Sequence, residues 1–130
     1  MDNKKIDTLF TEAKLARERS YCPYSGFAVG AALLTADGRI YHGCNIENAA
    51  FSPTVCAERT AIFKAISEGD RELAAIAIAG AKQGEAPIED CYPCGVCRQV
   101  LAEFCTPDLI VITATGRTTL GALLPNSFNL

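Results

Sequence analysis

Residues 27–45 read FAVGAALLTADGRIYHGCN. The first part of this stretch, Phe27–Thr35, is a mostly apolar run that predicts a β-strand. Asp37 and Gly38 follow it and give a strong signal for a tight hairpin turn. Arg39–Asn45 then predicts a returning antiparallel strand. We therefore expect the sheet of this protein to begin with a β-hairpin.

One helix is predicted before the hairpin, and helices and strands alternate after it. Apolar residues at helical spacing predict a surface helix over residues 3–19. The remaining predicted elements are strands at Leu73–Gly80 and Leu109–Thr113 and helices at Cys56–Ser67, Cys94–Phe104 and Thr118–Leu124. The order α-β-β-α-β-α-β-α predicts one α/β domain over residues 1–130, with a mixed central sheet and crossover helices.

Composition excludes several classes of function. The net charge of −3, without a basic cluster, argues against a nucleic-acid-binding protein. No apolar stretch is long enough to span a membrane, and residues 1–5 do not resemble a signal peptide. Seven cysteines without a secretory signal argue for a reducing compartment, where thiols serve as metal ligands or catalysts. We expect a cytoplasmic protein that acts on a small molecule.

Two short stretches carry chemistry: C-A-E at residues 56–58 and P-C-G-V-C at residues 93–97. Cys94 and Cys97 are three residues apart, and on a helix this spacing places both sulfurs on one face. Cys56 can supply a third thiolate. Zinc is normally tetrahedral, and catalytic sites keep the fourth position open for water. The sequence predicts one zinc ion per chain, held by these three cysteines.

Glu58 is the predicted acid/base. It stands two residues after Cys56, so the two side chains of a helix would point in different directions, and Glu58 can reach a water at the metal without binding the metal. C-x-E followed by P-C-x-x-C is the three-cysteine form of the zinc deaminase pattern. Three thiolates leave a local charge of −1 on Zn²⁺, and Arg59 is a candidate for compensating it through N–H···S bonds. The alternative for Arg59 is an ordinary surface charge or ion pair.

Four stretches together carry a wider resemblance, at residues 23–32, 43–50, 56–61 and 93–100. Over nearly its whole length, the chain resembles a cytidine deaminase of the short, zinc-dependent, homotetrameric kind. The resemblance implies a three-layer α/β/α sandwich. It also implies hydrolytic deamination of cytidine and 2′-deoxycytidine to uridine and 2′-deoxyuridine, as part of pyrimidine salvage.

The resemblance also implies individual roles. Cys56, Cys94 and Cys97 match the zinc ligands, and Glu58 matches the proton shuttle. The residues that match substrate-binding positions are Phe27 against the base, Asn45 and Glu47 at the ribose hydroxyls, Ala57, and Phe51 and Phe128, which reach into a neighbouring subunit's site. Position 51 is often Tyr in the family, so any contact through that hydroxyl is absent here.

Other interpretations of these residues stay open from sequence alone. Asn45 and Glu47 could be turn residues, and Phe27 could be a core residue. A C-x-x-C at a helix start also resembles a dithiol redox protein, although this leaves Glu58 unexplained. A structural zinc module would want a fourth Cys or His ligand. Cys91 could replace Cys56 as a ligand, but it precedes the predicted helix.

Overall fold

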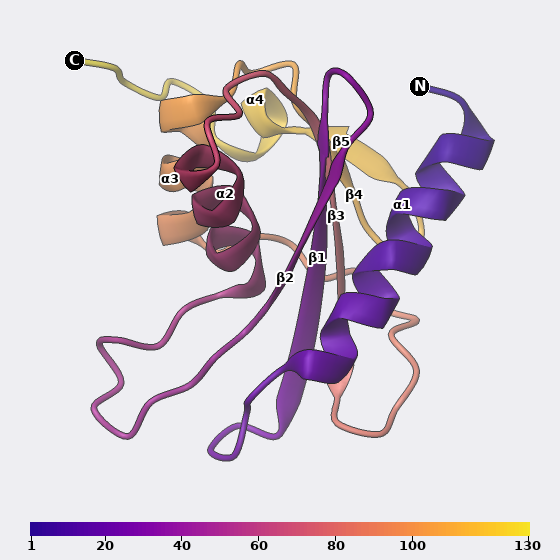
Figure 1. Cartoon of the computed structure of the whole chain (residues 1–130), viewed down its shortest axis with the longest axis vertical. Helices are drawn as coiled ribbons and strands as arrows, with labels where there is room; N and C mark the ends of the chain where they lie inside the picture. Colours follow the sequence, from indigo (N-terminus) through magenta and orange to yellow (C-terminus); the bar gives the residue numbers. More distant parts are fainter.

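The computed structural model describes residues 1–130 and contains a five-stranded sheet in the order β2-β1-β3-β4-β5 (Figure 1). The strands are β1 (Phe27–Thr35), β2 (Ile40–Cys44), β3 (Leu73–Lys82), β4 (Ile110–Ile112) and β5 (Arg117–Thr119). The helices are α1 (Asn3–Ala16), the 3₁₀-helix η1 (Arg17–Arg19), α2 (Ala57–Ser67), α3 (Gly95–Phe104) and α4 (Leu120–Leu123). Only β3 and β4 pair in parallel. The predicted mixed sheet is confirmed.

Helices cover both faces of the sheet, with α1 on one side and α2 and α3 on the other (Figure 1). Side chains of a strand alternate between the two faces, and β3 uses this alternation to sort its residues by size. Its Ile76 and Ile78 belong to the core cluster beneath α2 and α3. The alanines on either side of Ile76, Ala75 and Ala77, pack in the second cluster beneath α1. The predicted three-layer α/β/α sandwich is confirmed.

The hairpin forms as predicted, with a slightly longer turn. The backbone N–H of Thr35 donates to the carbonyl of Arg39 at 2.9 Å, so three residues make the turn. Gly38 has a φ of 97°, a conformation that glycine adopts without the steric cost of a side chain. The antiparallel register joins Leu34 to Ile40 and Gly30 to Cys44.

Gly43 allows α2 to lie directly on β2. A Cβ atom at Gly43 would lie 2.3 Å from the carbonyl oxygen of Ala57 and 2.5 Å from the amide nitrogen of Ala61. Backbone atoms of a helix cannot give way as a flexible side chain can, so only glycine fits here. The start of α2, next to Cys56, is thereby fixed against the sheet.

Side chains of α2 also cover the free edge of β2. Lys64 Nζ donates to the carbonyl of His42 at 2.6 Å, and Thr60 Oγ1 donates to the carbonyl of Cys44 at 3.0 Å. His42 itself meets Glu12 at 3.1 Å, away from the cysteine stretches. No helix of the protein combines the length and the apolar character needed to cross a membrane.

The predicted helix over Thr118–Leu124 is wrong in its first part. Arg117–Thr119 forms β5, in which Thr118 pairs with Val111 and Thr119 with Ile110 of β4. β-Branched threonine suits a strand, and pairing with β4 overrides the helical pattern. Thr119 then serves both elements, since its Oγ1 accepts a hydrogen bond from the Ala122 amide at 3.2 Å and caps α4.

Candidate active site

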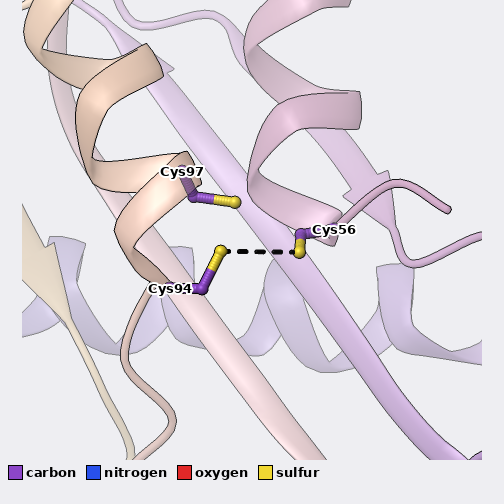
Figure 2. A group of neighbouring side chains, drawn as sticks. All are labelled: Cys56, Cys94 and Cys97. Atoms are coloured by element: carbon purple, nitrogen blue, oxygen red, sulfur yellow. Dashed lines mark hydrogen bonds between the residues drawn. The ribbon is translucent and has the colours of Figure 1, made fainter. Parts of the chain in front are cut away.

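Three cysteine sulfurs meet where α2 and α3 begin (Figure 2). Cys56 is the N-cap residue of α2, Cys94 is the N-cap residue of α3, and Cys97 lies in the first turn of α3. All three Sγ atoms lie within 4.8 Å of one another, and those of Cys56 and Cys94 are 3.9 Å apart. Zn–S bonds of about 2.3 Å in a tetrahedral site place two sulfurs about 3.8 Å apart. The spacing therefore fits a zinc ion.

The surroundings of Cys56 favour its thiolate form. The neighbouring Cys97 thiol lowers the pKa of Cys56 by hydrogen bonding, and Arg59 adds to this, so that the pKa falls to about 5 although burial opposes it. Arg59 Nη2 lies 3.3 Å from the Cys56 sulfur. The helix N-terminus contributes partial positive charge to the same sulfur. A ligand that is already deprotonated binds a metal without first losing a proton.

Arg59 points into the protein, not into solvent. Its Nε is buried and has no hydrogen-bond partner within the chain, while Nη2 contacts the Cys56 sulfur. The pKa of Arg59 is raised, chiefly by this hydrogen bond. Arg59 is therefore not the exposed surface charge that the sequence left open as an alternative.

Glu58 is buried beside the sulfur cluster, with 4% of its surface exposed. Burial raises the pKa of its carboxyl to about 7, and the negative charge of Cys56 acts in the same direction. A group with a pKa near the working pH can both accept and return a proton. Glu58 is thus suited to general acid–base catalysis next to the place where a metal would bind.

Asn45 fixes the beginning of β1. Its Nδ2 donates to the carbonyl of Phe27 at 2.8 Å, and its Oδ1 accepts from the amide of Val29 at 2.9 Å. The side-chain amide of Asn45 therefore continues the pairing of β1 and β2 beyond the last residue of β2. Asn45 supports the backbone of the residue whose ring is predicted to contact the base.

Glu47 is held by the loop before β1. Its carboxylate accepts from the backbone amides of Tyr24 at 2.9 Å and Ser25 at 3.1 Å, and from the Ser25 hydroxyl. The Ser25 hydroxyl is the main reason why the pKa of Glu47 lies below its usual range. Glu47 is therefore an ionised acceptor in a fixed position. The turn role considered from sequence is present, and it leaves the carboxylate on the surface.

Phe27 is not a core residue, because 41% of its surface is exposed. Its ring borders a cleft of about 520 Å³ between the ends of β1 and β3 and the loop that follows β3. Cys91 lines the same cleft, and burial raises the pKa of its thiol to about 11. Cys91 is not part of the sulfur cluster. It is a neutral thiol of the cleft wall.

The other predicted substrate-binding residues differ in exposure. Ala57 is fully buried at the first position of α2. Phe51 and Phe128 extend into solvent, with 74% and 67% of their surfaces exposed. Phe51 also has a φ of 62°, which is rare for a bulky residue. Neither phenylalanine is buried by its own chain.

Sequence reasoning missed two residues that support the site. Ser25 anchors Glu47, and the Ser-Gly pair that ends the turn after Pro23 was the available signal. Arg98 holds the backbone beside Cys94 through its guanidinium. It directly follows Cys97, but sequence alone does not show that its side chain turns back toward Pro93, which lies just before the N-cap of α3.

Comparisons with known proteins agree with this geometry. The family model described as "Cytidine and deoxycytidylate deaminase zinc-binding region" matches residues 3–113. A cytidine deaminase of Sporosarcina psychrophila is 50% identical over 129 residues, covering 95% of this chain and 91% of that protein. The crystal structure of cytidine deaminase from Burkholderia pseudomallei has a TM-score of 0.85 at 46% identity, covering 98% of this chain and all of that one (100%). That of Mycobacterium tuberculosis has a TM-score of 0.84 at 40% identity, covering 95% and 97%. The chain belongs to the cytidine and deoxycytidylate deaminase family.

Proposed function

We propose that this protein is a zinc-dependent deaminase that hydrolyses cytidine and 2′-deoxycytidine to uridine and 2′-deoxyuridine, with release of ammonia, in pyrimidine salvage. The observation that carries the proposal is the cluster of three cysteine sulfurs, within 4.8 Å of one another, beside the buried carboxyl of Glu58. A dithiol redox protein needs neither Cys56 nor Glu58. A structural zinc module needs a fourth ligand, and the cluster contains only three.

Residues of this chain divide the chemistry between them. When held by Cys56, Cys94 and Cys97, zinc would act as a Lewis acid and lower the pKa of its bound water toward about 7. Glu58 accepts the proton of the attacking water, transfers a proton to N3 of the cytosine ring, and then helps to protonate the amine that leaves C4. Its pKa of about 7 suits both directions of transfer. One water enters and one ammonia leaves, so the reaction balances without an oxidant or a reductant.

Arg59 compensates the charge of the ligand set. Three thiolates give Zn²⁺ a net local charge of −1, which makes it a weaker Lewis acid than a neutral ligand set would. The contact of Arg59 Nη2 with the Cys56 sulfur, at 3.3 Å, draws electron density from that ligand. We assign Arg59 this role.

Phe27, Asn45, Glu47 and Ala57 form the nucleoside site in this proposal. The exposed ring of Phe27 offers an apolar surface to the base. Asn45 and the ionised Glu47 stand where β1 begins, held by backbone contacts that leave little freedom to move. Fixed polar groups of this kind suit recognition of ribose hydroxyls.

Free cytosine is expected to be a very poor substrate, and Glu47→Ala should lower kcat/KM for cytidine. A hydrogen bond to a charged group contributes about 1.5–3 kcal/mol. Losing the bond between the Glu47 carboxylate and a ribose hydroxyl should therefore lower kcat/KM roughly 10- to 150-fold. The measurement is the decrease of cytidine absorbance over a range of substrate concentrations. Glu12→Ala, which removes a carboxylate that contacts His42, serves as the control. Equal turnover of cytosine and cytidine would contradict the assignment.

We further propose a cytoplasmic homotetramer of single-domain subunits, residues 1–130, whose active sites are shared. Exposure of Phe51, Phe128 and Leu130 supports an interface between copies, because large apolar side chains gain free energy when they are buried. All seven cysteines are free thiols, which supports a reducing compartment.

Deleting residues 126–130 should therefore lower activity more than it lowers zinc content, and should weaken the oligomer. The removed segment contains Phe128 but none of the zinc ligands, so metal binding within a subunit is retained. Light scattering coupled to size exclusion measures the assembly, and metal analysis of the same fractions gives zinc per chain. A fully active monomer at catalytic concentration would rule out shared sites.

The function as a whole is tested by adding purified protein to cytidine and measuring the loss of absorbance and the ammonia produced, with zinc quantified in the same sample. We expect turnover that scales with zinc content and disappears after chelation. A zinc-loaded protein that releases no ammonia from cytidine or 2′-deoxycytidine would overturn the proposal.

A further inference from the structure

We propose that Arg98 is a positioning residue that holds the exposed zinc ligand Cys94 in place and ties the metal-binding turn to the C-terminal segment. Arg98 Nε donates to the carbonyl of Pro93 at 2.7 Å, and Nη1 donates to the carbonyl of Leu123 at 2.8 Å. This inference rests on the proposed function in one respect, namely that the turn binds zinc.

Cys94 is the ligand that most needs support. Cys97 is buried and belongs to the first turn of α3, so its sulfur is held by the surrounding core. Cys94 is exposed, lies outside the helix as its N-cap, and makes no side-chain capping hydrogen bond. The position of its sulfur therefore depends on the backbone that carries it.

Arg98 holds that backbone from both sides of Cys94. Its backbone N–H donates to the carbonyl of Cys94 at 2.9 Å, and its side chain donates to the carbonyl of Pro93. Two consecutive carbonyls are thus bound by one residue. Because peptide groups are planar, fixing both carbonyls limits the rotation of the Pro93–Cys94 peptide and the direction of the Cys94 side chain.

A second donor of the same guanidinium reaches a distant segment. Leu123 is the last residue of α4, after which the chain continues to Phe128. Both contacts are partly buried, and unsatisfied carbonyls in such places are costly. Arginine can serve both carbonyls because its planar group presents five donors in a fixed fork, whereas lysine offers one flexible ammonium.

The rate of zinc release tests this role directly. Zinc-loaded wild type, Arg98→Met, Arg98→Lys and Arg71→Met would be mixed with a chromophoric chelator, below their unfolding temperatures. Arg71 is the control, since its guanidinium also donates to two carbonyls. These belong to Ile66, in the last turn of α2, and to Asp70, just after that helix. Groups that orient metal ligands are worth about 10- to 100-fold in metal affinity. We expect Arg98→Met to release zinc at least about tenfold faster than Arg71→Met, with Arg98→Lys between them.

Substitution with Co²⁺ supplies a readout that a general loss of stability does not change. Thiolate-to-cobalt absorption reports the number of bound sulfurs, and in Arg98→Met it should fall toward that of a two-thiolate site. Arg71→Met should keep the wild-type spectrum. If Arg98→Met does not fold, Arg98→Lys decides: faster release than wild type supports the role, and the wild-type rate overturns it.

Failure of the proposed function and failure of the Arg98 role would give different results. A wild-type protein that binds no zinc overturns the proposed function and this inference together. A wild-type protein that binds zinc, with Arg98→Met matching Arg71→Met in release rate and cobalt spectrum, overturns only the role of Arg98.

Discussion

Glu58→Gln is expected to abolish turnover while zinc and nucleoside remain bound. Glutamine keeps the size of the side chain and can still hydrogen-bond, but it cannot accept a proton. General acid–base catalysis contributes about 10²–10⁴-fold for one transfer, and Glu58 serves several transfers in the proposed mechanism. We therefore expect kcat to fall by at least about 10⁴-fold.

Three measurements on one preparation establish this result. Absorbance gives residual turnover, metal analysis gives zinc per chain, and calorimetry gives nucleoside affinity. Because Glu58 is buried with a raised pKa, a neutral amide in its place removes no buried ion pair, and the fold should persist. A variant that keeps a large share of wild-type turnover would move the proton shuttle to another residue.

Cys56→Ala is expected to lose both zinc and activity. Its sulfur is one of three that lie within 4.8 Å of one another, and the hydrogen bond to Arg59 stabilises its thiolate form. Removing it leaves only the sulfurs of Cys94 and Cys97, both at the start of α3, which no longer bridge α2 and α3. After dialysis against a weak chelator, we expect zinc content to fall below about a tenth of the wild-type value, since ligand number governs metal retention.

Cys91→Ala is the matched control for this experiment. It removes a cysteine thiol from the neighbouring cleft wall, outside the cluster. Zinc content should stay at one ion per chain. Full zinc in Cys56→Ala together with loss of zinc in Cys91→Ala would reverse the ligand assignment.

The larger elements could be predicted from sequence because their patterns are long. β1 spans Phe27–Thr35, as predicted, and the helix predicted from Cys56 ends at Ser67 as expected. β4 lies within the strand predicted at Leu109–Thr113, whereas β5 has only three residues, too few for a period to show. β5 exists because it pairs with β4, and such a tertiary cause is not visible in a local pattern.

The same distinction between local sequence patterns and long-range contacts applies to the site. The three cysteines and Glu58 were predicted as candidate groups because C-x-E and C-x-x-C are each short local motifs, although the two motifs lie far apart in the chain. The anchoring of Glu47 by Ser25 joins residues 22 positions apart, and the contact of Arg98 with Leu123 spans 25 positions. Contacts of that range depend on how the chain folds back on itself. Sequence identified the candidate reacting groups, and the structure was needed to find the residues that hold them.

The covered edge of β2 has a consequence for how copies of this chain can associate. An open edge strand offers free carbonyls and amides to a strand of another molecule, which is the usual route to runaway sheet growth. Here the carbonyls of His42 and Cys44 already accept hydrogen bonds from Lys64 and Thr60. A second strand could pair along this edge only after these two side chains move away from it. Extension of the sheet at β2 is therefore disfavoured, and any interface between copies is expected to use helices, loops or the C-terminal tail instead.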